Sequence, residues 1–194
     1  MKTFYSNNMK LIHKFLLNQF ALSLFGFMTI MAMSSFGTMA MYVTTVLAAL
    51  FFASLLYDNA WDEGARDRNK ISNGRLTARP FHGVKVALFS YIPTLVFLIP
   101  LLVITIVSLA GVNALDSLMS VLKAIVIFIF NGMYLGFSYG LPDIFPETQC
   151  LFYILYLLPA LIAYGLGYYL GTEDKQIKTF FGLAPTTDEP KKKK

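Results

Sequence analysis

The sequence predicts an all-α protein, a polytopic transmembrane bundle of about five helices, from three observations. Of the 194 residues, 56% are hydrophobic and only 14% are charged, and the mean hydropathy is +0.59. Soluble globular domains carry about 25% charged residues. The apolar residues also gather in runs of about 20, the length that an α-helix needs to cross a bilayer. Finally, the charges concentrate in one internal segment and near the two ends.

The predicted spans follow one another with short connections and form a single transmembrane domain over residues 1–171. Residues 34–37 are enough for a tight turn, so the first two spans should form an antiparallel hairpin. Proline residues interrupt the chain between the fourth and fifth spans. Residues 172–194 are a polar tail, which we expect to be partly disordered. The five spans cover residues 15–33, 38–57, 86–110, 121–140 and 151–170.

The third span contains Pro93 and Pro100. Proline lacks a backbone N–H and tends to kink a helix, and membranes tolerate such kinks when neighbouring groups satisfy the freed carbonyls. We therefore expect a kinked helix here. Broken helices can also bind solutes through their backbone, so the kink carries an alternative interpretation as part of a transport site.

Residues 58–85 form the only sizeable polar loop, between the second and third spans. Asp58, Asp62 and Arg66 follow at helical spacing, which predicts that the second span continues as a polar helix to about Asn69. The Asn73-Gly74 pair is favoured in a type I′ turn, so residues 70–77 should form a small hairpin or a tight bend.

The loop is the place where contacts with other molecules are expected. Basic residues next to a membrane bind anionic lipid headgroups, and Trp favours the interface. The net charge of +5 is explained in this way and predicts no nucleic-acid partner. The residues expected to touch headgroups, or a membrane or cytosolic protein partner, are Trp61, Arg66, Arg68, Lys70, Arg75, Arg79 and Lys85.

Lysine and arginine predict the orientation, because they are enriched in cytoplasmic loops. Nine of them lie in the N-terminal lead and the 58–85 loop, against three near the membrane on the other side. This places the N-terminus in the cytoplasm and, with five spans, residues 172 onward outside. A re-entrant fourth span is the alternative.

Small residues recur every four positions in the fourth and fifth spans, a pattern that allows close helix packing. The spacing does not decide between packing within one chain and packing between two copies. The predicted packing residues are Gly132, Gly136, Gly140, Ala163, Gly167 and Gly171.

No defensible reaction centre is found in the sequence. The spans carry no Asp, Glu, Lys or Arg away from their ends, which argues against ion-coupled carriers. One Cys and two His are too few for a metal site built from these residues, and we expect no cofactor. The leading hypothesis is a non-enzymatic accessory or structural membrane subunit. The alternatives are a small-solute transporter that uses the third span, and a lipid-headgroup-modifying enzyme that uses Asp62 or Glu63.

The run YDNAWDEGARDRNKISNGR, residues 57–75, lies between a helical hairpin and a proline-containing span. In this first half the chain resembles uncharacterised small multi-pass membrane proteins of Gram-positive anaerobic bacteria. The resemblance implies a bacterial plasma membrane and no particular activity.

Overall fold

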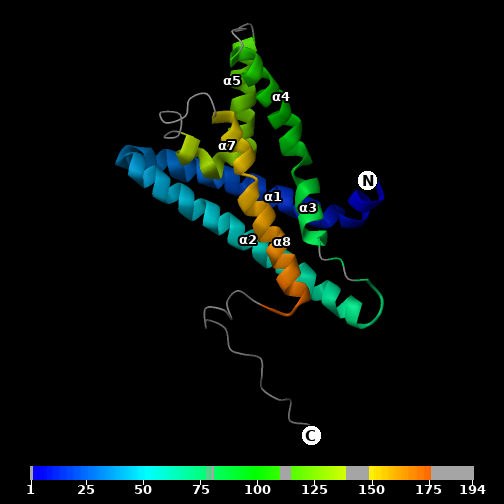
Figure 1. Cartoon of the computed structure of the whole chain (residues 1–194). Coiled ribbons are helices and arrows are strands. Elements are labelled where there is room, and N and C mark those ends of the chain that lie inside the picture. Colours follow the sequence, from blue (N-terminus) through cyan, green and yellow to red (C-terminus); the bar gives the residue numbers. More distant parts are fainter. Residues whose placement is uncertain (1, 78, 80, 110–114, 139–148, 176–194) are drawn as a thin grey trace.

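The computed structural model describes residues 2–77, 79, 81–109, 115–138 and 149–175 (Figure 1). These residues form helices and short connections, with no strand among them, so the all-α class is confirmed. Four helices are long and apolar enough to cross a membrane, and a bent pair would make a fifth. The elements are α1 (Lys2–Met33), η1 (Ser34–Phe36), α2 (Thr38–Ser72), α3 (His82–Ser90), α4 (Ile92–Leu109), α5 (Asp116–Ile125), η3 (Val126–Asn131), η4 (Gly132–Tyr134), α7 (Gln149–Leu155) and α8 (Leu158–Thr172).

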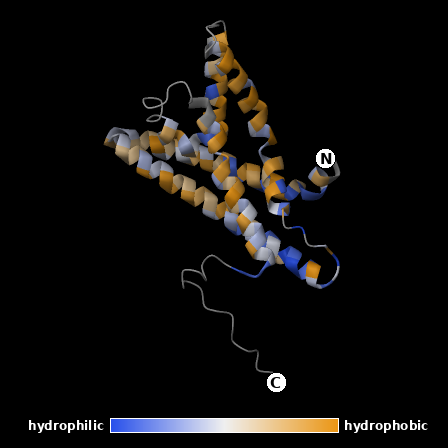
Figure 2. Ribbon diagram, in the orientation of Figure 1, coloured by the Kyte–Doolittle hydropathy of each residue, from blue (hydrophilic) through white to orange (hydrophobic). Residues whose placement is uncertain are grey.

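Helices α1 and α2 form the predicted antiparallel hairpin (Figure 1). The connection between them turns at Gly37, whose φ of 95° lies in a region that favours glycine. Helix α2 runs beyond the apolar residues 38–57 as a polar extension that ends at Ser72, which confirms the helix expected to about Asn69. Figure 2 shows this change from hydrophobic to hydrophilic residues along α2.

The end of α2 is a tight bend and not a β-hairpin. The N–H of Gly74 bonds the carbonyl of Ile71, and the N–H of Arg75 bonds that of Lys70. This pair of bonds, with Gly74 at φ 69°, is a Schellman motif. A type I′ turn would also need positive φ at Asn73, whose φ is −87°, so the type I′ prediction is wrong.

Helices α3 and α4 are separated by a bend of 57° near Tyr91. Pro93 lies directly after the bend and cannot donate a hydrogen bond to the carbonyl of Phe89, one turn earlier. The expected distortion of the third span therefore coincides with Pro93. Pro100 lies inside α4, which continues through it.

The stretch from α5 to Ser138 is helical but irregular. After α5 the helix widens into the π-helix η3, and the 3-10 helix η4 follows it. This irregular stretch lies beside the middle of α1, because the Gln19 side chain donates a hydrogen bond to the carbonyl of Phe130. Farther along, Gly136 lies against Met41, near the turn between α1 and α2. The predicted fourth span therefore does not continue as one straight helix.

Helix α8 packs along α2 in a parallel arrangement (Figure 1). Gly167 lies against Tyr57, and Gly171, one turn later, lies against Trp61. Both helices therefore run in the same direction toward the polar end of α2. The interior beside this pair is filled with buried aromatic and aliphatic side chains, among them Phe52, Leu56 and Tyr164.

Candidate functional site

Three polar contacts between distant parts of the chain lie at the charged end of α2. The end of α8, the start of α3 and the first turns of α1 meet there. The ring centroid of His82, at the start of α3, lies 5.1 Å from that of Tyr168 on α8 and 5.7 Å from that of Phe4 on α1. We call this region the charged end of the molecule.

Glycine residues allow α2 and α8 to meet there with their backbones in contact. A Cβ atom on Gly64 would overlap the carbonyl oxygen of Tyr168, and one on Gly171 would overlap that of Trp61. On α3, a Cβ on Gly83 would lie 2.6 Å from the Cβ of Tyr168. The close approach brings short polar side chains of α2 within reach of α8.

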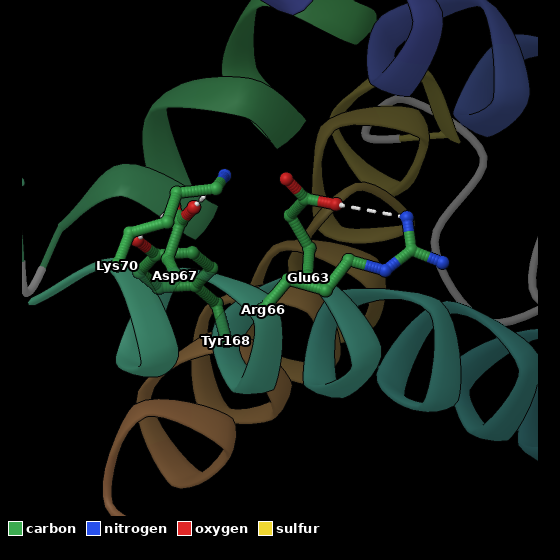
Figure 3. A network of polar contacts seen from close by, with 5 residues as sticks. All are labelled: Glu63, Arg66, Asp67, Lys70 and Tyr168. Atoms are coloured by element: carbon green, nitrogen blue, oxygen red, sulfur yellow. Dashed lines mark hydrogen bonds and ion pairs between the residues drawn. The ribbon is translucent and has the colours of Figure 1, made fainter. Parts of the chain in front are cut away.

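A buried carboxylate lies at the centre of this contact (Figure 3). Asp67 is only 5% exposed. Tyr168 donates a hydrogen bond of 3.0 Å to its Oδ2 atom, and Lys70 Nζ lies 2.6 Å from its Oδ1 atom. The hydrogen bond to Asp67 raises the pKa of Lys70 above its usual value. The two donors compensate the burial of the negative charge.

Glu63 lies one turn before Asp67 on α2, and it forms an ion pair of 3.8 Å with Arg66, which directly precedes Asp67 (Figure 3). The Arg66 side chain is 73% exposed, so this ion pair contributes little to stability. Together with the first turns of α1 these two residues line a hollow of about 650 Å³. Its lining mixes both charges with neutral amides, and it is not a site for one sign of charge.

The residues just after α8 are held against α2. The Trp61 Nε1 atom donates a 2.8 Å hydrogen bond to the carbonyl of Lys175, and Arg68 forms an ion pair with Asp174. The sequence predicted opposite sides of the membrane for residues 58–85 and for residues 172 onward. These segments lie side by side through residue 175, which favours the same side of the membrane for both.

A pocket of about 340 Å³ opens beside the start of α3, lined by Phe4, Arg79, Phe81, His82 and Lys85. Arg79 and Lys85 supply two cations, and none of the described lining residues is acidic. Phe81 is 70% exposed next to them. Two cations beside an exposed aromatic ring are suited to an anion that carries an apolar group. We call this the basic pocket.

The seven predicted contact residues therefore separate into groups. Only two of them, Arg79 and Lys85, line the basic pocket. Three others are occupied within the chain, as described above: Trp61, Arg68 and Lys70. Arg66 pairs with Glu63, and Arg75 is exposed just beyond α2.

The most buried members of the charged end, Asp67 and Tyr168, were not predicted. A sequence signal existed, because Gly167 and Gly171 flank Tyr168 and indicated a close helix contact there. The partner helix, however, could not be identified from that pattern.

Two of the other predicted packing residues also lie at contacts within the chain. Gly132 lies against the backbone of Ser23, and Gly136 against Thr45 on α2. Ala163 is half-buried. Gly140 lies outside the described residues.

Within the described part of the chain, no group of three or more His, Cys, Asp or Glu residues is placed to hold a metal ion. No protein-family model, no curated protein and no solved structure matches the chain.

Proposed function

We propose that this chain is a multi-pass, non-enzymatic membrane protein whose basic pocket binds the headgroup of an anionic phospholipid. The observation that carries the proposal is the pairing of Arg79 with Lys85 in a pocket next to the exposed ring of Phe81. A headgroup phosphate fits between the cations while Phe81 and the acyl chains share the apolar layer.

The position of the basic pocket supports a lipid ligand over a soluble anion. The pocket is lined by residues at the start of α3, which follows the polar extension of α2 in the chain and precedes the apolar α4. Figure 2 shows the hydrophilic end of α2 and the hydrophobic α4. A phosphate in a membrane lies at the boundary between such polar and apolar parts. Each Lys or Arg close to an anionic membrane surface contributes about 1 kcal/mol.

The proposal includes an orientation in which the charged end faces the cytoplasm. Lys and Arg are enriched on that side of membranes, and the charged end carries most of the basic residues of the first 85 positions. The resemblance of the first half of the chain adds the bacterial plasma membrane as its location.

We also propose four full spans, with residues 115–138 as part of a re-entrant segment. Helices α2 and α8 are parallel and both end at the charged end. The chain therefore leaves α2 at the charged end and enters α8 at the opposite end, so the segment between them has to cross the membrane an odd number of times. The bent pair of α3 and α4 provides one crossing. The following segment must then return to the side on which it began, as the direction of residues 126–136 along α1 supports.

The experiment measures lipid binding by purified protein in nanodiscs that contain neutral phosphatidylcholine with added phosphatidylglycerol. We expect the Arg79→Gln/Lys85→Gln variant to lose about 30-fold in affinity for phosphatidylglycerol, from about 1 kcal/mol for each cation. The matched control, Arg66→Gln/Arg75→Gln, removes the same charge outside the basic pocket, and it should lose clearly less affinity because Arg66 is already paired with Glu63. Equal losses in both variants would show unspecific attraction and would exclude the basic pocket as the site. If the purified protein retains a bound cytosolic protein and no lipid, a protein partner is favoured over a lipid.

A further inference from the structure

A second polar cluster lies far from the charged end, where the helix of residues 117–138 is broken. Its members come from three parts of the chain: Gln19 and Ser23 on α1, Thr94 on α4, and Asn131 with Tyr134 at the break. All five are buried, and none carries a charge at neutral pH. Such a cluster inside apolar spans has to satisfy its own hydrogen bonds.

Part of the cluster compensates the break in the helix. Ser23 Oγ donates a 3.0 Å hydrogen bond to the carbonyl of Phe128 and accepts one of 2.6 Å from the N–H of Gly132. Gln19 Nε2 lies 3.3 Å from the carbonyl of Phe130 and 3.3 Å from the hydroxyl of Thr94. Backbone groups that lack a regular helical hydrogen bond at the π-helix are thus hydrogen-bonded to side chains of α1.

Three atoms of the cluster have no partner in the part of the chain that the structure describes. Among the described residues, Gln19 Oε1, Asn131 Nδ2 and the Tyr134 hydroxyl have no hydrogen-bond partner. The three side chains are 1%, 2% and 3% exposed. The set consists of one acceptor, one donor and one group that can do both. Each unpaired group destabilises a buried site, so three at one break point to a missing binding partner.

We infer that the break binds a small uncharged molecule that both donates and accepts hydrogen bonds. Water is the smallest such molecule, and a small amide or alcohol has the same chemistry. A donor on this molecule satisfies Gln19 Oε1, and an acceptor satisfies Asn131 Nδ2. A charged ligand is disfavoured because the cluster offers it no counter-charge. This inference is independent of the basic pocket and its lipid.

The sign of a stability change tests this inference. Asn131 Nδ2 has no partner among the described residues, so without a bound molecule the loss of this atom stabilises the protein or leaves its stability unchanged, whereas the loss of a bonded atom destabilises it. We expect Asn131→Leu to lower the melting temperature in nanodiscs by about 3 °C or more. Asn18→Leu, which removes a half-buried amide of α1 outside the cluster, is the control and should change it less. An unchanged or higher melting temperature for Asn131→Leu would overturn the inference.

The leucine introduced by Asn131→Leu could lower the melting temperature only because it packs badly. An experimental density map of the parent protein tests for the bound molecule independently of this variant. The expected map has a peak within hydrogen-bond distance of both Gln19 Oε1 and Asn131 Nδ2. A single-atom peak identifies water and an extended one identifies a solute, and either supports the inference. Well-resolved side chains with no density between them would overturn it.

Discussion

Removing the hydroxyl of Tyr168 should separate the ends of α2 and α8. In the parent, this hydroxyl donates to a carboxylate that is 5% exposed, and Tyr168 itself is 1% exposed. A hydrogen bond to a charged group contributes about 1.5–3 kcal/mol. Lys70 does not replace it, because its side chain is 53% exposed and the ion pair is largely screened by solvent. We therefore expect Tyr168→Phe to lose about 2 kcal/mol.

For a chain of this length, about 2 kcal/mol corresponds to a melting temperature lower by about 4–8 °C. The assay is thermal unfolding in nanodiscs, followed by the fluorescence of Trp61, the only tryptophan of the chain. Trp61 bonds the carbonyl of Lys175, so its fluorescence reports on this contact. The control is Tyr169→Phe, which removes a hydroxyl from a side chain that is 46% exposed.

A double-mutant cycle makes the test specific. In an Asp67→Asn background the acceptor is no longer charged, so Tyr168→Phe should cost clearly less than in the parent. Equal melting temperatures for Tyr168→Phe and Tyr169→Phe, or equal costs in the two backgrounds, would refute the reasoning.

Two further predictions concern glycine residues and use the same melting assay. Gly171→Ala should destabilise the protein more than Gly165→Ala, because the first new Cβ overlaps a backbone carbonyl while the second meets only a movable Val84 methyl group at 2.8 Å; similar losses would contradict the parallel packing. Gly74→Ala should cost about 1 kcal/mol, because Gly74 ends α2 with φ of 69°. An unchanged melting temperature would contradict the Schellman ending.

The features that could be predicted from the sequence depend on local patterns. Apolar runs of membrane length gave the all-α class, and charges at helical spacing gave the extension of α2 to Ser72. The Asn73-Gly74 pair led to the wrong type I′ prediction because the same two residue types also occur at Schellman endings of helices. When a helix precedes them, its free carbonyls capture the N–H groups of Gly74 and Arg75, and a Schellman ending results.

The features that could not be predicted depend on contacts between distant residues. Asp67 and Tyr168 are 101 positions apart, so no local spacing reveals that the carboxylate is buried and bonded. The break beside Asn131 is likewise stabilised from another helix, through Gln19 and Ser23. The predicted side of residues 172 onward depended on an odd number of spans, and a single re-entrant segment in place of a span would change it.

The most direct test of the account is whether the ends of α2 and α8 face the same side of the membrane. Single cysteines are placed in a Cys150→Ser background at Ser35, Asn73 and Glu173, and intact cells are treated with a membrane-impermeant maleimide. We predict that position 35 is labelled in intact cells and that positions 73 and 173 are labelled only after lysis. Labelling of position 173 in intact cells, with position 73 still protected, would contradict it.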